Sequence, residues 1–335
     1  MWIYDKKEKV ENQVKNYLNM DKFPLIKGYN FDNKFNFNEF INSYKNMAFQ
    51  GSNLGLGMEL LNNIYDKRKD EKIKIYLSFT GNMISSGNRE IIKFLVKNNY
   101  VDAIVTTASG IEEDIIKSIK PFHLGTFDVK GEILLNECIG RIGNIFVPAD
   151  RYLYLERFIN KIFPKLSKEL KSAHEITKLI GEEISLNELT KDKKEDSFLY
   201  WAHKNKIPVF CPGITDGAIG DMAVFYKQKD KNFAIDVIKD NEKLTNMLMN
   251  SEKTASIILG GGISKHFLLN AAIFRDGFDY SLYVSTAEGF DGSDSGGNQE
   301  EAITWAKIKP NAQKIKINCD ATIAFPLLIS SVFSK

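Results

Sequence analysis

The sequence is poor in cysteine, tryptophan and proline. Its 335 residues include 3 cysteines, 3 tryptophans and 8 prolines. Cys138, Cys211 and Cys319 are far apart and each lies in an apolar context. They have neither the spacing of a zinc site nor the density of a disulfide scaffold. We therefore expect reduced thiols in a cytoplasmic protein, with no metal site.

Neither charge sign is in large excess, and long apolar segments are lacking. The 45 lysines and arginines nearly balance the 43 aspartates and glutamates, which leaves a net charge of +2. Overall charge therefore gives no argument for nucleic acid or an anionic membrane as a partner. No segment approaches the roughly 18 apolar residues of a membrane span, and charged residues at 5–8 stand where a signal peptide needs an apolar core.

The chain does have the composition of a globular protein, with 43% hydrophobic and 26% charged residues. Its length suffices for one large α/β domain or two ordinary ones, and no internal repeat or low-complexity linker divides it. We therefore predict one domain over residues 24–335. Residues 1–23 form a predicted N-terminal helical appendage, because Val10, Val14 and Leu18 have helical spacing.

Strands and helices alternate along this domain. An apolar strand at 73–79 leads through Thr80-Gly81-Asn82 into a helix at 83–97, and a strand at 103–106 leads into an acidic helix start at 112–114. This repetition predicts a Rossmann-like parallel sheet flanked by helices, with ligands at the carboxyl ends of the strands. The G-x-G-x-x-G fingerprint of dinucleotide sites is absent. Further strands are predicted at 209–211, 233–238, 256–259, 280–285 and 314–317.

The densest group of chemically useful residues lies between positions 260 and 308. A glycine triplet at 260–262 joins a predicted strand to a helix, where backbone N–H groups can bind an anion, although a simple tight turn has the same pattern. His266 suits an acid/base role because imidazole titrates near neutrality, or it caps the helix. The loop 289–297 offers oxygens to ammonium groups or ribose hydroxyls. The alternatives are a solvated turn and a calcium loop, although the EF-hand spacing of Gly and Glu is missing.

A helix is predicted at 300–308. Glu301 and Trp305 are four residues apart and share a face, while Lys307 lies near the helix end. A lone lysine is usually a solvated charge. The apolar neighbours of Lys307 could instead desolvate it and lower its pKa, which would make the neutral amine a nucleophile.

Two carboxylates follow the strand predicted at 209–211. Asp216 and Asp221 would place negative charge at a strand end, which suits a cationic substrate or a ribose. Capping of the next helix by Thr215 or Asp216 accounts for the pattern equally well. Asp236, on the strand predicted at 233–238, would complete this edge.

These residues together resemble the deoxyhypusine synthase family. The C-terminal signature of that family has a glycine triplet, Lys-His, Thr-Ala, Phe-Asp-Gly-Ser-Asp-Ser-Gly, Glu-Ala and Trp-Gly-Lys. This sequence matches it in order over 260–307, with Ala306 in place of the last Gly. Further matching pieces extend the resemblance to roughly residues 25–333: Ser85-Ser86-Gly87, Thr106-Thr107-Ala108, Ile111 to Asp114, Arg141 to Asn144 and Pro208 to Met222.

The resemblance implies an NAD-dependent aminobutyl transferase that acts on spermidine. In such an enzyme Lys307 would carry the transferred group as an imine, and His266 would act as acid and base. The residues that match cofactor contacts are Asn82, Ser85, Ser86, Thr107, Ala108, Glu113, Asp216, Gly260, Gly261, Gly262, Thr286, Ala287, Ser295, Asp320 and Ala321. Those that match polyamine contacts are Tyr152, Asp221, Asn270, Gly292, Ser293, Asp294, Glu301 and Trp305.

The resemblance further implies that the acceptor is a lysine of the initiation factor 5A precursor, and that the enzyme is a homotetramer with sites at a subunit interface. Two alternatives stay open. One is the closely related homospermidine synthase, which uses putrescine as the acceptor, and the other is a non-catalytic polyamine or NAD binder. Three positions depart from the family pattern, because Ser109 and Ala306 replace Gly and Ala149 replaces Asn.

Overall fold

The structure is a computed structural model that describes residues 22–334. The chain divides into two compact units, which meet in sequence between Leu56 and Gly57. The appendage predicted at residues 1–23 lies outside the described residues except for its last two. Within the first unit, the described part contains α2 (Phe37–Ser43), η2 (Tyr44–Asn46) and the first turns of α3 (Phe49–Lys67).

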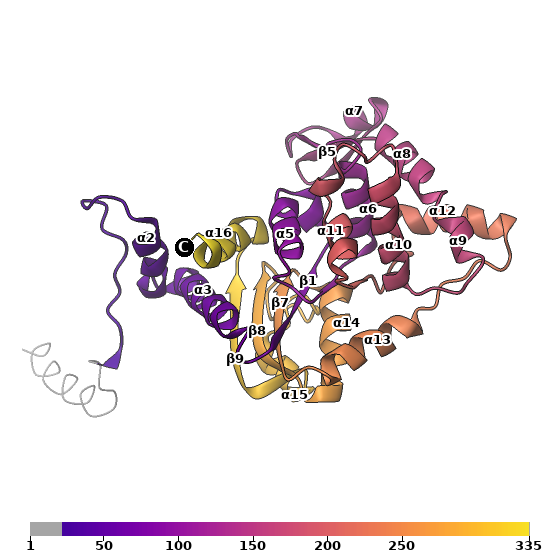
Figure 1. Cartoon of the computed structure of the whole chain (residues 1–335). Helices are drawn as coiled ribbons and strands as arrows, with labels where there is room; N and C mark the ends of the chain where they lie inside the picture. The colour runs from indigo at the N-terminus through magenta and orange to yellow at the C-terminus, as the bar shows by residue number, and fades with distance from the viewer. Residues whose placement is uncertain (1–21, 335) are drawn as a thin grey trace, which may run out of the picture. The chain divides into compact units, whose positions relative to one another are not determined.

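The second unit is built on a six-stranded parallel sheet, which confirms the predicted Rossmann-like architecture (Figure 1). The strand order is β6-β2-β1-β7-β8-β9. Chain order therefore reverses between β1 and β7, which is where sheets of this kind open a crevice for ligands. The strands are β1 (Ile73–Phe79), β2 (Ala103–Val105), β6 (Val209–Phe210), β7 (Lys253–Leu259), β8 (Phe278–Ser285) and β9 (Ile308–Asn318).

Helices cover both faces of this sheet, so its central strands are apolar on both sides. On one face, Tyr76 of β1 and Ile258 of β7 pack in one cluster with Leu244 and Leu268, which belong to α13 (Ile238–Met249) and α14 (Gly262–Ala272). The remaining helices of this unit, apart from two single 3-10 turns, are α4 (Asn82–Ser85), α5 (Asn88–Lys97), α6 (Ala108–Lys117), α7 (Gly131–Asn136), α8 (Asp150–Ile159), α9 (Phe163–Leu166), α10 (Ala173–Leu186), α11 (Phe198–Asn205), α12 (Ala218–Lys229), α15 (Gln299–Thr304) and α16 (Ala321–Phe333). No described helix is long and apolar enough to cross a membrane.

A second, smaller sheet lies between α6 and α8 in the sequence. It has three antiparallel strands in the order β3-β5-β4, namely β3 (His123–Leu124), β5 (Ile145–Pro148) and β4 (Ile139–Ile142). Its strands are only two to four residues long, which is too short for an alternating pattern to predict the sheet from the sequence.

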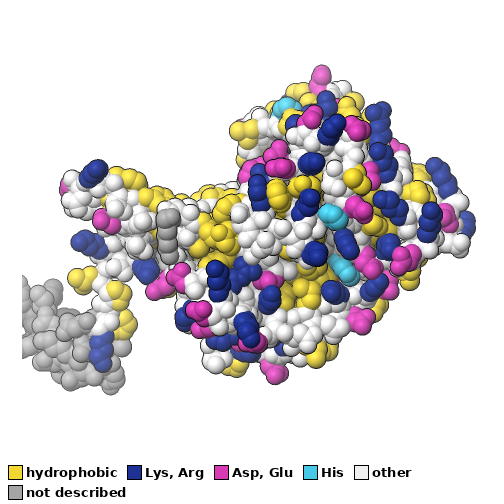
Figure 2. All heavy atoms as spheres, in the orientation of Figure 1, with side chains coloured by type: hydrophobic (Ala, Val, Ile, Leu, Met, Phe, Trp, Pro, Cys, Tyr) yellow, Lys and Arg dark blue, Asp and Glu magenta, His cyan; other side chains and the backbone are white. Residues whose placement is uncertain are grey.

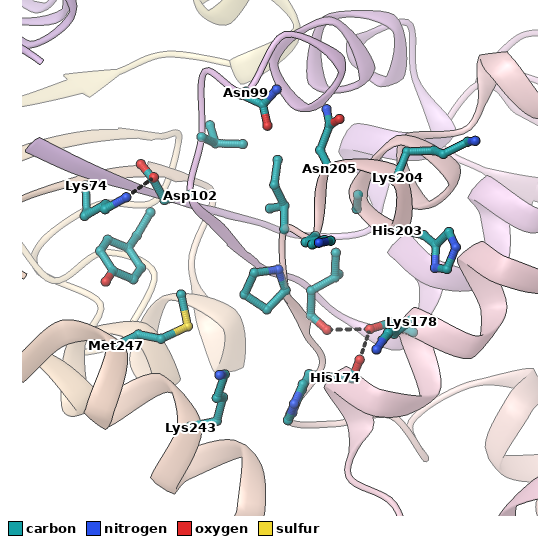
Figure 3. Close-up of a pocket in the computed structure, with 18 of the residues that line it drawn as sticks. Lys74, Asn99, Asp102, His174, Lys178, His203, Lys204, Asn205, Lys243 and Met247 are labelled. Atoms are coloured by element: carbon teal, nitrogen blue, oxygen red, sulfur yellow. Dashed lines mark hydrogen bonds and ion pairs between the residues drawn. The ribbon is translucent and has the colours of Figure 1, made fainter. Parts of the chain in front are cut away.

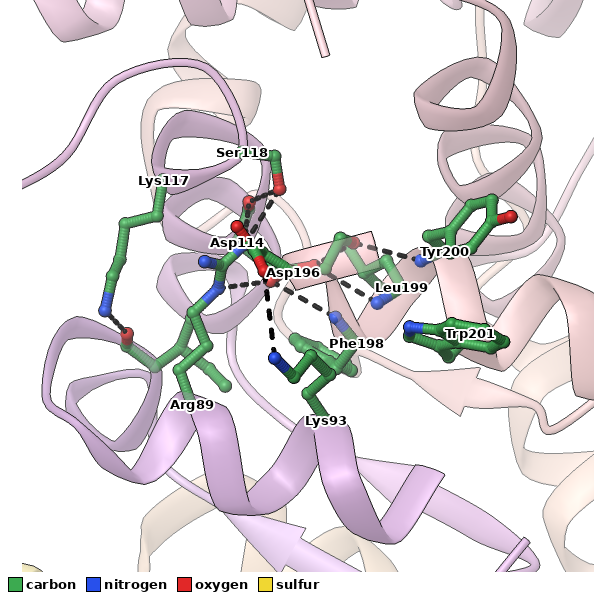
Figure 4. Close-up of polar contacts among 12 residues, drawn as sticks. Arg89, Lys93, Asp114, Lys117, Ser118, Asp196, Phe198, Leu199, Tyr200 and Trp201 are labelled. Carbon is green, nitrogen blue, oxygen red and sulfur yellow. Dashed lines mark hydrogen bonds and ion pairs between the residues drawn. The ribbon is translucent and has the colours of Figure 1, made fainter. Parts of the chain in front are cut away.

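The helix predicted at 83–97 is broken at Ser86 and Gly87. The Lys117 ammonium reaches across from α6 and donates to the carbonyl oxygens of Ile84, Ser85 and Ser86 at 2.8, 3.1 and 3.1 Å (Figure 4). These carbonyls end α4, so the lysine satisfies groups that a continuous helix would have bonded internally. The break fixes the turn after β1 against α6.

A buried ion pair anchors α6 itself. The Arg89 guanidinium on α5 donates to the Asp114 carboxylate at 2.8 Å, and both side chains are almost fully buried (Figure 4). Asp114 also accepts from the Ser197 hydroxyl at 2.6 Å and from the Leu199 backbone N–H at 3.1 Å, at the start of α11. A carboxylate with this many donors is well compensated for its burial. The network fixes the positions of α5, α6 and α11 relative to one another.

The prediction of a strand at 233–238 is wrong. This stretch forms only an isolated bridge between Lys171 and Ile235. The Asp236 carboxylate accepts from the backbone N–H groups of Ile238 and Lys239 at 3.1 Å each, so it caps the start of α13. Asp236 therefore does not complete the ligand edge of the sheet.

Candidate functional site

The turns after β1 and β2 are packed tightly against each other. The Gly81 N–H donates to the Thr107 hydroxyl at 3.0 Å, and that hydroxyl lies 3.0 Å from the Ser109 hydroxyl. A Cβ at Gly81 would lie 1.8 Å from the Ser109 Oγ, so only glycine fits there. The hydroxyl of Ser109, which departs from the family pattern, is thus part of the contact between the two turns.

Two side chains predicted as cofactor contacts meet just behind these turns. The Ser85 hydroxyl donates to the carboxylate of Glu113, and both residues are buried. Burial raises the pKa of Glu113 to about 7, although the Ser85 hydrogen bond and the Lys117 charge act in the opposite direction. Glu113 is therefore close to half protonated at neutral pH. Asn82, at the start of α4, is exposed.

In the turn after β6, neither Thr215 nor Asp216 caps the following helix. The Glu112 carboxylate on α6 accepts from the Ile219 N–H at 2.7 Å and so binds the start of α12 in place of Thr215 or Asp216. A Cβ at Gly217 would lie 2.6 Å from the same carboxylate. Asp216 and Asp221 are exposed, and their side chains have no hydrogen-bond or ion-pair partner among the described residues. They are available for a cationic ligand or a ribose.

Tyr152, on α8, belongs to the same half of the site. Burial, followed by the charges of Glu113 and Glu112, raises the pKa of its hydroxyl. The start of α8 is held by the Ala149 N–H, which donates to the Cys138 carbonyl at 2.9 Å. This bond uses only the backbone of Ala149 and tolerates the missing Asn side chain.

The glycine triplet forms the turn between β7 and α14, as predicted. Gly260 and Gly262 have φ values of +85° and +66°, in the left-handed region that favours glycine. A Cβ at Gly261 would lie 2.4 Å from the Ser295 Cα, so the loop after β8 packs directly on the triplet. No atom lies within 4 Å of a Cβ built on Gly262. This leaves open space at the N-terminus of α14, an 11-residue helix whose dipole favours an anion there.

Lys265 anchors the loop after β8, and the sequence analysis did not single it out. Its ammonium donates to the carbonyl oxygens of Asp294 and Gly297 and lies 5.0 Å from the ring centre of Tyr283. The side chain is buried, and burial lowers its pKa. One signal was available, because Lys265 has the spacing of the buried apolar positions Leu268 and Leu269 on α14.

His266 and Asp294 lie side by side and are candidates for an acid/base pair. The His266 Nδ1 lies 3.0 Å from the Asp294 Oδ1, while the Asp294 Oδ2 is buried without a hydrogen-bond partner among the described residues. His266 does not cap α14, because the helix begins at Gly262. Asn270 lies one turn further along α14, on the face of His266, and is exposed.

The loop that carries Asp294 has its own internal bonds. The Asp291 carboxylate accepts from the Ser293 N–H at 2.7 Å, and Gly292 has a φ of +74°. The Lys316 ammonium donates to the Gly296 carbonyl at 2.6 Å. Thr286 is exposed, and the Ala287 N–H donates to the Ser285 hydroxyl at 3.1 Å.

At the end of β9, Asp320 acts as the N-cap of α16. Its carboxylate accepts from the N–H and the hydroxyl of Thr322, both at 2.7 Å. The Ala321 carbonyl accepts from the Asn88 side chain at 3.2 Å. The capping bonds use one carboxylate oxygen of Asp320, and the other stays available to a ligand.

The helix predicted at 300–308 ends early, at Thr304. Trp305 follows as the C-cap with 63% of its surface exposed, and Ala306 has a φ of +54°. Lys307 therefore lies in the turn that enters β9 and not on the helix. Since Ile308 pairs with Phe278 at the start of β8, this turn is at the amino edge of the sheet.

Lys307 is nevertheless connected to the carboxyl edge through α14 and α15. Its backbone N–H donates to the Ala302 carbonyl at 2.9 Å. Burial lowers the pKa of Lys265, the charge of Glu301 raises it, and the charge of Lys307 lowers it further. The half-buried Lys307 and the exposed Glu301 have no side-chain hydrogen-bond or ion-pair partner within residues 22–334.

The predicted residues thus form two groups on different halves of the sheet. One contains Ser85, Glu113, Tyr152 and the carboxylates after β6, and the other surrounds α14, the loop after β8 and α15. Strand β6 and strand β8 are separated by three strands, which places them about 19 Å apart at the usual interstrand spacing. The start of α14 nevertheless reaches the turn after β6, where a Cβ at Gly213 would lie 3.5 Å from the Ile263 Cδ1.

Comparisons with known proteins point to one family. The family model for deoxyhypusine synthase matches residues 39–332. A Methanocaldococcus jannaschii protein named "Probable deoxyhypusine synthase" is 45% identical, and the match covers 86% of this chain and 90% of that protein. The deoxyhypusine synthase of Senecio vernalis is 41% identical, with 92% and 89% covered. The crystal structure of an Entamoeba histolytica "putative deoxyhypusine synthase" has a TM-score of 0.64 at 28% identity and covers 92% of this chain and 97% of that one.

Proposed function

Because the chain belongs to the deoxyhypusine synthase family, we propose that it transfers the 4-aminobutyl group of spermidine, with NAD as cofactor, to a lysine of the initiation factor 5A precursor. The observation that supports this most directly is the pair formed by His266 and Asp294. The loop that carries Asp294 leads through α15 to Lys307. An acid/base pair and a lysine nucleophile are what an aminobutyl transfer requires.

The carboxyl edge of the sheet fits a dinucleotide. The open space at Gly262 gives a pyrophosphate access to the N-terminus of α14. Ser85, Glu113 and Asp216 offer polar groups for ribose hydroxyls, and Thr107, Ala108 and Ser295 line the turns between them. When bound there, NAD would accept a hydride from spermidine and return it at the end of the reaction.

The second group of residues suits an elongated polycation. Asp294 and Glu301 supply negative charge, and the exposed indole of Trp305 can add a cation–π contact of about 0.5–2 kcal/mol. Asn270 and the loop residues Gly292 and Ser293 offer further hydrogen bonds. The buried and unpartnered Oδ2 of Asp294 would gain a partner from a bound ammonium group.

The roles of His266 and Lys307 follow from their surroundings. The Asp294 carboxylate holds the proton on Nδ1 of His266, which leaves Nε2 free to take a proton from the secondary amine of spermidine. After hydride loss, the Lys307 amine adds to the imine carbon, and 1,3-diaminopropane leaves with the bonding electron pair and a proton. The acceptor lysine then displaces Lys307 from the same carbon, and the free amine of Lys307 is restored.

The two separated groups support an oligomer with composite sites. Asp221 follows β6 and Asp294 follows β8, and three strands lie between β6 and β8, so we infer that the two carboxylates that contact one spermidine come from different subunits. Mixed oligomers of Asp221→Asn and Asp294→Asn test this directly. If sites are composite, refolding the two inactive variants together restores about a quarter of the activity by random pairing. Sites within one chain would give no recovery.

The acceptor is tested by competition. The enzyme is incubated with NAD and spermidine labelled in the butyl group, together with equal concentrations of initiation factor 5A precursor and putrescine. We expect label in the protein. Label only in homospermidine would replace the proposal with homospermidine synthesis, and a lack of borohydride-trapped label on Lys307 would favour a non-catalytic binder.

A further inference from the structure

A cavity lies at the amino ends of β1, β2 and β6, whereas the proposed cofactor turns lie at their carboxyl ends. Its volume is about 910 Å³. Its floor contains Tyr76 of β1, together with Pro208 and Val209 at the start of β6. The labelled side chains around it come mainly from α10, α11 and α13 (Figure 3). None of the residues predicted for catalysis, cofactor or polyamine binding lines it. The active site does not account for it.

The cavity is strongly basic. Six lysine and arginine side chains line it against a single carboxylate, that of Asp102. Asp102 is already neutralised, because it bonds Arg68 at 2.8 Å, Lys74 at 3.0 Å and the Ile75 N–H at 2.8 Å. The other four cationic residues are Lys178, Lys204, Lys206 and Lys243.

Three of these lysines line the cavity from different elements. Lys178 is on α10, Lys206 follows α11 and Lys243 is on α13, and Figure 3 labels Lys178 and Lys243. None of the three ammonium groups has a hydrogen bond or an ion pair with another described residue. Figure 2 shows the same face, with histidine side chains among Lys and Arg side chains. A concave surface lined by one sign of charge concentrates the electrostatic potential and attracts an anion.

Two histidines add hydrogen-bonding capacity. The His174 Nδ1 faces the buried Asp240 carboxylate at 2.7 Å, so its other ring nitrogen is left without a partner in the described chain. The Nδ1 of His203 is buried and also lacks a partner there. Apolar surface from Tyr76, Ile207 and Met247 lies between these groups. The lining therefore combines several cationic donors with apolar side chains.

We propose that this cavity is a second ligand site, which binds a nucleoside polyphosphate. The lysines of α10, α11 and α13 contact the phosphates, and the apolar floor receives the base. A nucleoside polyphosphate has both features, whereas an inorganic anion would leave the apolar floor uncovered. The site lies at the amino ends of β1, β2 and β6, whose carboxyl ends lead into the proposed NAD turns.

The test is calorimetric titration of the full chain with ATP, in the absence and in the presence of saturating NAD. The charge-reversal variant Lys178→Glu/Lys243→Glu is compared with the control Lys168→Glu/Lys229→Glu, whose lysines are exposed and do not line the cavity. We expect one saturable ATP site, unaffected by NAD, that weakens at least about tenfold in the first variant and less than about twofold in the control. The milder Lys178→Gln/Lys243→Gln replaces the first variant if charge reversal impairs folding.

Several outcomes would overturn the proposal. They are the absence of saturable ATP binding, competition between ATP and NAD, and equal weakening in the cavity variant and the control. Tripolyphosphate separates the two parts of the ligand. If it binds as tightly as ATP, the apolar floor does not contribute and the nucleoside assignment is wrong. The titration does not require catalysis, so its result is independent of the proposed transferase activity.

Discussion

The protonation of Glu113 predicts two opposite effects of one substitution, namely a gain in stability and a loss of NAD affinity. Its buried carboxyl has a pKa raised from 4.5 to about 7, mainly by burial. Between these values the native state binds more protons than the unfolded state, so the free energy of unfolding falls as pH rises through this window. Above the raised pKa, this deficit in the free energy of unfolding is complete. It amounts to about 3 kcal/mol, because each pKa unit corresponds to about 1.4 kcal/mol.

Glu113→Gln removes this deficit while it keeps the shape of the side chain and a possible hydrogen bond to Ser85. We expect the variant to be more stable than the wild type by up to about 3 kcal/mol at pH 8 and by much less at pH 5. NAD affinity should fall at the same time, because the substitution removes a proposed cofactor contact. Urea unfolding at both pH values, at a fixed protein concentration, measures the first effect, and NAD titration measures the second.

Glu132→Gln is the matched control, because Glu132 is exposed on α7. It should change neither stability nor NAD affinity. If Glu113→Gln instead destabilises the protein equally at pH 5 and pH 8, the ionised carboxylate is a net stabilising group. The assignment of burial as the dominant effect would then be refuted.

Three further substitutions test the second half of the site. Lys307→Arg keeps the charge but cannot form an imine, so butyl transfer should disappear while NAD titration stays unchanged; normal transfer would refute the nucleophile. Asp294→Asn removes a charge beside His266, and the KM for spermidine should rise by the equivalent of about 2–5 kcal/mol with little change for NAD; a loss confined to NAD would make Asp294 a cofactor contact. Ala306→Gly should raise the free energy of unfolding by about 1 kcal/mol, because Ala306 has a φ of +54°; thermal unfolding at fixed concentration checks this, and a loss of stability would contradict it.

The strands of the large sheet were predictable because their signal is local. β1 and β7 are runs of residues that are buried almost throughout, and such runs alternate with helices only in parallel sheets. The glycine triplet was predictable for the same reason, since a strand end, three glycines and an apolar helix are adjacent in sequence. The turns at the carboxyl edge were predictable from the same alternation, because each of them joins the end of a strand to the start of a helix.

The errors arose where distant residues decide the local structure. The break at Ser86 and Gly87 depends on Lys117, which is thirty residues away in sequence. The cap of α12 comes from Glu112 on another helix, which no spacing around Asp216 could show. The early end of α15 depends on Ala306 in a left-handed conformation that is uncommon for alanine.

The three departures from the family pattern have different consequences in this structure. Ser109 adds a hydroxyl that contacts Thr107 at 3.0 Å, and its neighbour Gly81 supplies the space it needs. Ala149 contributes a backbone bond to the Cys138 carbonyl and no polar side chain, so the change removes at most one ligand contact. Ala306 is the only one of the three with a positive φ. A glycine there would avoid a strain of about 1 kcal/mol, whereas alanine restricts the conformations of the turn. Since this turn carries Lys307 between Trp305 and β9, the strain acts on the position of the proposed nucleophile itself.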